Sequence, residues 1–171
     1  MATQYPGWLA GQRITAARIS ASLPQFVYCE TNLDRTTSTL SADPVLQFPL
    51  EANAVYVVEF CLFLGATATA QRPRTRWSAP TASDGLRGVF GPGSTATSDN
   101  NITARSGCHG MATIVEYGIR GANTNLQHIT EAGTVFTTDA GTLALEWAQT
   151  TTSATFTRRG MASWGRCTRV G

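Results

Sequence analysis

The chain has 171 residues, which is enough for one folded domain with a short extension. Charged residues make up 14% and aromatic residues 9%, with a formal net charge of +2, a balance that excludes an intrinsically disordered chain and gives no electrostatic case for nucleic acid as a partner. The longest apolar run, Ala54 to Ala66, is interrupted by Glu59 and is too short for a membrane-spanning helix, so we expect no membrane association.

Residues 1–24 differ in pattern from the rest of the chain and are predicted to form an extended N-terminal arm. Thr15 can cap a short helix that Pro24 ends. Ile19 and Leu23 are four residues apart and would share one face of that helix. A helix of about two turns is marginal in isolation, so we expect contacts elsewhere to order it.

From Gln25 onward the hydrophobic pattern changes to a period of two, which is typical of β-strands. The strongest signal is Ala54–Leu64, which we expect to be a central strand covered on both faces. Thr142–Gln149 alternates clearly, and the turn residues 139–141 before it predict a hairpin. The other predicted strands are Phe26–Cys29, Arg35–Ser41, Arg74–Ser78, Ala112–Arg120, Thr134–Thr138, Ala154–Arg159 and Met161–Val170.

One long segment, Gly85–Asn101, is rich in Gly, Pro, Ser, Asp and Asn and is predicted to be a loop. Many short strands separated by turns are typical of two-sheet folds. We therefore predict an all-β fold: an antiparallel β-sandwich or jelly roll over residues 25–171, with an extended N-terminal arm over residues 1–24 that contains a short helix.

Residues that carry catalysis or bind metals are sparse in this sequence. Cys108 and His109 are adjacent, and adjacent strand residues face opposite ways, so they do not form a catalytic pair. A metal shared by His109 and His128 would lack a third protein ligand. The four cysteines contain no CxxC pair and are expected to be mostly buried thiols, with a disulfide as the alternative. We predict no enzymatic activity, no cofactor and no metal; a polysaccharide hydrolase would need two acids facing each other in a cleft.

A basic and aromatic cluster occupies the predicted strand at residues 72–77. Arg74, Arg76 and Trp77 form a candidate ligand surface, because charge beside an aromatic ring suits single-stranded nucleic acid or, with Trp77 as a platform, a carbohydrate. The alternative is an edge strand whose outward arginines prevent pairing with other sheets. We favour the edge strand over nucleic acid.

The arm carries apolar side chains that need a surface to bury them. Burial of one such side chain contributes about 1.5–3 kcal/mol, whereas ordering the backbone costs about 1–2 kcal/mol per residue. The arm is therefore expected to become ordered by docking on another chain, the alternative being a strap packed on its own domain. The predicted docking residues are Trp8, Leu9, Arg13, Ile14, Arg18, Ile19 and Leu23.

Both ends of the sequence resemble known proteins. Residues 6–19, with Trp8, Ala-Gly-Gln and Thr-Ala-Ala, resemble the opening of small virion proteins of actinobacterial tailed phages, and residues 141–149 and 160–166 resemble their late strand and ending. The resemblance implies a bacteriophage virion structural protein made in the bacterial host cytoplasm. It would be a capsid decoration or minor tail protein, forming a homotrimer and docking on major capsid or tail proteins. The alternative is a carbohydrate- or host-surface-binding minor tail protein. The resemblance does not separate head from tail.

Overall fold

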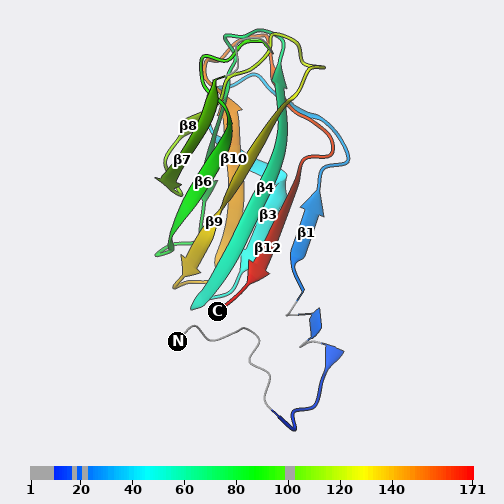
Figure 1. Ribbon diagram of the computed structural model, residues 1–171, viewed down its shortest axis with the longest axis vertical. Helices are drawn as coiled ribbons and strands as arrows, with labels where there is room; N and C mark the ends of the chain where they lie inside the picture. The colour runs from blue at the N-terminus through cyan, green and yellow to red at the C-terminus, as the bar shows by residue number, and fades with distance from the viewer. Residues whose placement is uncertain (1–9, 17–18, 21–22, 99–102) are drawn as a thin grey trace.

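The computed structural model describes residues 10–16, 19–20, 23–98 and 103–171. Its regular structure consists of antiparallel β-strands arranged in two sheets that pack face to face (Figure 1). The prediction of an all-β antiparallel sandwich is therefore confirmed.

In the described part of the chain, the larger sheet has eight strands and follows the order β1-β12-β4-β9-β6-β7, with β11 paired to the last residues of β4 and β2 paired to β11. Its strands are β1 (Gln25–Tyr28), β2 (Leu33–Arg35), β4 (Ala54–Ala66), β6 (Asp84–Pro92), β7 (Ala104–Gly110), β9 (Gln127–Thr137), β11 (Thr157–Arg159) and β12 (Trp164–Arg169). The smaller sheet follows the order β3 (Ser41–Leu50), β10 (Gly141–Gln149), β5 (Pro73–Ser78) and β8 (Val115–Glu116).

Strand pairing is nested along the chain. β1 pairs with β12, β3 with β10, β4 with β9 and β5 with β8, so early strands meet late ones. The β6–β7 hairpin lies between β5 and β8 in sequence and extends the larger sheet beyond β9. β4 is central and hydrogen-bonded on both edges, as predicted, but it is not covered on both faces, because Val57 is 48% exposed on the side away from the smaller sheet.

Aromatic side chains fill the space between the sheets. Phe60 from β4 stacks on Phe48 with ring centroids 5.7 Å apart and meets Trp77 edge-on at 5.4 Å. Trp147 of β10 is fully buried beside them in the same core. Each such ring contributes a few kcal/mol through the apolar area that it removes from water, and together they hold the two sheets in register.

Two sequence-based predictions are wrong and one strand was not predicted, for identifiable reasons. The first part of the predicted loop Gly85–Asn101, through Pro92, belongs to strand β6, because its residues alternate between core and solvent despite the glycines. Ser41–Leu50 forms β3, although Pro44 and Pro49 argue against a strand, because an edge strand tolerates proline. Residues 139–141 do not close a hairpin, since β9 and β10 belong to different sheets.

The predicted helix of the arm is not seen as a helical element. Ala16, Ile19 and Ser20 have helical backbone, and the Ile19 amide donates to the Thr15 carbonyl at 3.1 Å, but the residues between and after them lie outside the described part of the chain. The described part of the arm precedes the N-terminal end of β1 and lies away from the two sheets (Figure 1).

Candidate interaction surface

Alternation along the strands gives the larger sheet an outward surface of its own. On β6, Arg87 and Val89 point into the core, whereas Leu86, Gly88 and Phe90 are exposed. We call the outward residues of β1, β12, β4, β9, β6 and β7 the outer face. These six strands lie side by side in Figure 1, with β3 and β10 behind them.

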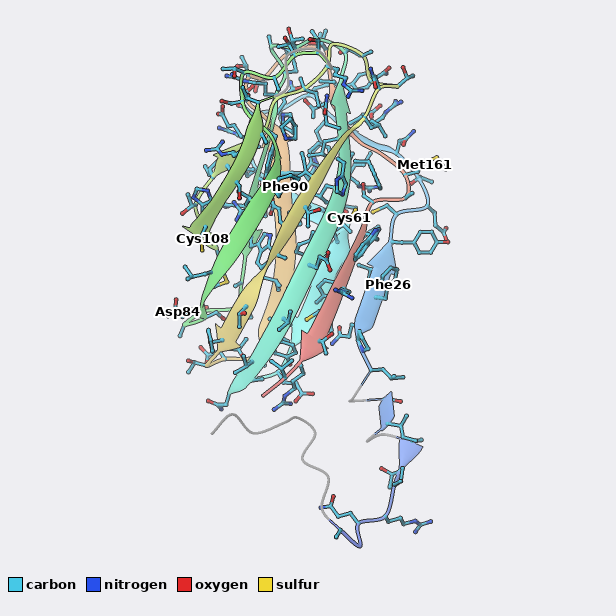
Figure 2. The ribbon with its side chains drawn as sticks, in the orientation of Figure 1. Phe26, Cys61, Asp84, Phe90, Cys108 and Met161 are labelled. Atoms are coloured by element: carbon cyan, nitrogen blue, oxygen red, sulfur yellow. The ribbon has the colours of Figure 1, made fainter. Side chains whose placement is uncertain are left out.

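Strand register arranges the outer face in rows that cross five or six strands. One row runs from β1 to β7 through Phe26, Arg166, Glu59, Ala132, Gly88 and Cys108. The next row runs through Tyr28, Trp164, Cys61, Thr130, Phe90 and Ser106. A third row holds Thr168, Val57, Thr134, Leu86 and Gly110. Figure 2 shows Phe26 and Cys108 at opposite edges of this face, with Cys61 and Phe90 between them.

Aromatic side chains cover the β1 end of the outer face. Phe26 is 61% exposed and stacks on Trp164 with ring centroids 5.4 Å apart and planes 20° apart. Tyr28, beside them, donates its hydroxyl to the Glu30 carboxylate. That hydrogen bond and the charge of Glu30 raise the pKa of Tyr28. The β1 edge of the outer face is therefore an exposed aromatic patch.

The β6 end of the outer face is hollowed. A groove of about 580 Å³ lies over β6 and β9. Gly88, Ala132 and Gly133 bring little side-chain volume to it, while Leu86 and Phe136 line it as large exposed side chains. We call these five residues the glycine groove. Asp84 also lines it, and Figure 2 places Asp84 at the start of β6, near the edge of the sheet.

The middle of the outer face is electrically balanced. Glu59 of β4 and Arg166 of β12 are neighbours in register and form an ion pair with 2.8 Å between Oε2 and Nε. Since the carboxylate and the guanidinium neutralise each other, the face does not present a large charge of one sign to an approaching surface.

A buried hydrogen-bonded cluster beneath the glycine groove determines which side chains of β6 and β9 point into the core. The Glu131 carboxylate accepts hydrogen bonds from Trp77 Nε1 at 2.8 Å, Arg87 Nη1 at 2.6 Å and the Tyr117 hydroxyl at 2.7 Å, and also from Thr75 Oγ1. Glu131 and Arg87 are fully buried. Burial raises the pKa of Tyr117, which keeps its proton as the donor. A one-residue slip of either strand would expose this cluster, so the register is strongly specified.

A second buried carboxylate, that of Asp43, forms a similar hydrogen-bonded cluster between β3, β10 and β11. Asp43 accepts from Trp147 Nε1 at 2.9 Å and from Arg159 Nε at 3.0 Å, and it also binds the backbone amides of Val45 and Leu46. Sequence reasoning missed both clusters. The available signal was an isolated acid inside an apolar alternating segment, which needs a buried partner.

One nucleophile and one imidazole meet on the outer face. Cys61 Sγ lies 3.3 Å from His128 Nε2, and the His128 ring lies against Phe63. Burial raises the pKa of the Cys61 thiol. A catalytic cysteine needs the opposite shift, toward the thiolate. The contact therefore fits packing between β4 and β9.

The cysteines are free thiols. Cys29, Cys61 and Cys167 are buried, as predicted, and Cys108 is exposed on β7. Among the residues that the structure describes, no group of three or more His, Cys, Asp or Glu side chains is arranged to hold a metal ion. Within the same part of the chain, no helix has both the length and the apolar character to cross a bilayer.

Trp77 of β5 lies inside the sandwich, whereas Arg74 and Arg76 are half-buried on the opposite side of the strand. The prediction that this strand is an edge strand is wrong, because β10 and β8 pair with its two edges. Trp77 is 1% exposed, with its indole N–H on Glu131, so it cannot be the exposed platform that was predicted. Arg76 pairs with Glu146 of β10 at 2.5 Å, and Arg74 donates to the Ser38 carbonyl. Trp77 follows the inward side of the alternation, which its neighbouring arginines obscured.

The described arm residues lie in solvent. Ile14 is 65% exposed, Ile19 48% and Leu23 60%. Arg13 is exposed as well. Leu23 also borders a small hollow beside β12, where it is the predicted docking residue nearest the sandwich. The predicted docking residues Trp8, Leu9 and Arg18 lie outside the described residues.

Comparisons with known proteins find weak similarity to solved structures. No family model and no curated protein matches this chain. Among solved structures, it is similar to the VP2 subviral particle of infectious bursal disease virus, with 8% identity and a TM-score of 0.21 over 98% of this chain and 45% of that one. It is also similar to the Gx strain structure of the same virus, with 9% identity and a TM-score of 0.19 over 99% and 46%. The chain thus spans less than half the length of these weak viral neighbours.

Proposed function

We propose that this chain is a structural protein of a bacteriophage particle, either a capsid decoration protein or a tail surface protein. Its N-terminal arm docks on the particle, and its β-sandwich projects outward. The protein acts by occupying and covering a surface, without catalysis. The partner of the arm is a major capsid or tail protein.

The nested strand pairing supports this proposal. Pairing of β1 with β12, β3 with β10, β4 with β9 and β5 with β8 is the strand arrangement of a jelly roll. Jelly rolls are recurrent building blocks of viral capsids and also of lectins. The fold alone does not choose between these uses, so the function has to be argued from the surfaces.

The observation that carries the proposal is the exposure of the arm's aliphatic side chains. Ile14 and Leu23 are 65% and 60% exposed, although the sandwich beside them has a complete core of its own. The first acidic residue of the chain is Glu30, so the arm before it is basic through Arg13 and Arg18. An apolar, weakly basic arm of this kind suits a segment that becomes ordered on another molecule.

The resemblance of residues 6–19 to the opening of small phage virion proteins supports the same assignment. That segment includes most of the arm. The burial of Trp77 removes the platform on which the carbohydrate-binding alternative rested.

Incorporation into particles tests the proposal. A tagged copy of the chain is produced in host cells during phage growth, and purified particles are probed for it. We expect the unmodified chain to co-purify with particles and the Ile14→Asp/Leu23→Asp variant to be lost from them. The matched control, Ala10→Asp/Ser20→Asp, places the same charges on exposed arm positions that carry no aliphatic group and should still be incorporated. Incorporation of the aliphatic variant at the unmodified level would contradict the docking role of the arm.

A further inference from the structure

We propose that the outer face of the larger sheet binds the outer face of a second copy of this chain, forming a two-fold symmetric dimer. The dimer is formed by the sandwich and does not require the arm. It goes beyond the proposed function, because it assigns a partner to a surface that particle docking leaves uncovered.

The first argument is the amount of apolar surface left in water. Phe26, Val57, Leu86, Phe90 and Phe136 are each about half exposed or more, and all lie on this one face. Exposed apolar side chains that are scattered singly need no explanation, whereas a contiguous patch marks an interaction site. On this face Leu86 and Phe136 line one groove, and Phe26 lies across the Glu59–Arg166 ion pair from them.

The second argument is size. Six strands about 4.8 Å apart, crossed by three rows of outward residues about 7 Å apart, give a flat footprint on the order of 600 Å². Protruding side chains add to the accessible area. Specific interfaces bury about 1,200–2,000 Å² over both partners, so a footprint of about 600 Å² on each copy reaches the lower end of that range.

The outer face is also complementary to itself. Consider a two-fold axis in the plane of the interface, parallel to the strands and between β4 and β9. It places β1 of one copy opposite β7 of the other, and β12 opposite β6. Each row then faces the same row of the second copy, so Phe26 meets the region of Cys108, and Trp164 meets Phe90.

Under this symmetry the aromatic β1 edge of each copy lies over the small outward side chains of β7 in the other, so Phe26 and Tyr28 face Cys108 and Ser106. The Glu59–Arg166 pair faces Ala132 and Gly88 of the second copy, and each contact occurs twice. Such an isologous arrangement closes at two copies. Face-to-face sheets in proteins pack about 10 Å apart with strands within about 30° of each other, which this pairing reproduces between molecules.

Charge does not oppose the pairing. The Glu59–Arg166 ion pair lies near the axis and is satisfied within one copy. Asp84 and His128 lie on the outward sides of β6 and β9. A two-fold dimer replaces the trimer that the resemblance to phage proteins implied.

The molar mass in solution tests the proposal. Sedimentation analysis of the full chain should give twice the 18.2 kDa chain mass at high concentration. Ala132→Arg places a long charged side chain in the glycine groove and should weaken the dimer on the order of 100-fold. The matched control Ala42→Arg makes the same change at an exposed position of β3, on the opposite sheet, and should leave the dimer intact.

A second variant distinguishes loss of the dimer from misfolding of the chain. A Cβ at Gly88 would have Ala132 O at 3.5 Å as its nearest neighbour, an ordinary contact, so Gly88→Arg is compatible with the fold. It should give a monomer that melts as cooperatively as the Ala42→Arg protein. Alkylation of Cys108 should also be slower in the dimer than in either monomeric variant.

Three results would overturn the pairing. They are an unmodified chain that stays monomeric at its highest attainable concentration, a mass of three chains, or a dimer that survives both Ala132→Arg and Gly88→Arg. A dimer that is lost equally in Ala42→Arg would place the interface on the smaller sheet and reject the outer face.

Discussion

Glu131 is the side chain on which both sheets converge, because its donors come from β5, β6 and the segment after β8. Glu131→Gln removes the charge that balances the buried guanidinium of Arg87. We expect a loss of about 3–5 kcal/mol in the free energy of unfolding, the range for breaking a buried pair. Urea denaturation measures it. The control is Glu51→Gln, which breaks the ion pair between Glu51 and Arg169. Because the Glu51 side chain is 71% exposed, this change should lower the free energy of unfolding by less than about 1 kcal/mol.

Two core thiols give the stability a pH dependence. Burial raises the pKa of Cys29 to about 11 and that of Cys167 to about 12. An unfolded thiol ionises near pH 8.5, so above that pH the folded state retains protons that the unfolded state has released. The free energy of unfolding should therefore fall as pH rises from about 9 to 11, by up to about 1.4 kcal/mol per pH unit for each thiol.

Cysteine variants identify the source of that slope. Cys29→Ala/Cys167→Ala should flatten the decline in unfolding free energy over this pH range, whatever its effect on stability at pH 7. Cys108→Ala, at the exposed position on β7, should leave the slope unchanged. An unaltered slope in the double variant would assign the pH dependence to other groups, such as Tyr117.

Sequence reasoning at the residue scale succeeded where a side chain had one plausible environment. Leu143, Leu145 and Trp147 alternate toward the core as predicted. It failed for Trp77, because a tryptophan between arginines can face either way, and only the strand's position in the sheet decides. The partners of Glu131 lie 14 to 56 residues away, so no local pattern shows that they meet.

At the scale of elements, two glycines of neighbouring strands respond differently to the same change. A Cβ on Gly133 would lie 2.1 Å from the Leu86 carbonyl oxygen, so Gly133→Ala must push β6 and β9 apart. We expect it to cost at least about 1–3 kcal/mol, as for other overpacking changes. Gly88→Ala meets only ordinary contacts and should be neutral or slightly stabilising. Thermal unfolding of the two variants compares them directly, and equal melting temperatures would contradict the close approach of these strands.

Glycine content also explains which strands can be recognised in the sequence. β4 and β10 are rich in apolar and branched residues, and both were predicted within a few residues of their ends. β6 contains Gly85, Gly88 and Gly91, whose presence indicates a loop in a local analysis. In the sheet, Gly85 allows β9 to approach closely and Gly91 allows packed side chains to do so, whereas Gly88 meets only ordinary contacts. The composition that hides the strand is therefore required by its neighbours in three dimensions.

At the scale of the whole molecule, the nested pairing means that distant segments close the sandwich. β1 pairs with β12 across nearly the full length of the chain, so the first strand is held only once the last is in place. No reading of adjacent segments predicts this order of strands. The two-sheet class follows from the alternation in sequence, while the order of strands depends on long-range contacts.

The arm and the sandwich should be independent in stability, and removal of residues 1–24 tests this. The described aliphatic side chains of the arm are mostly in water, so deleting them removes little buried apolar area. β1 starts at Gln25 and keeps its register with β12. We expect the truncated chain to unfold within about 0.5 kcal/mol of the full chain, as for surface changes in general, and to keep its dimer while losing attachment to particles. A melting temperature lowered by several degrees would instead show that the arm packs on its own domain and would remove the reason for assigning it to another molecule.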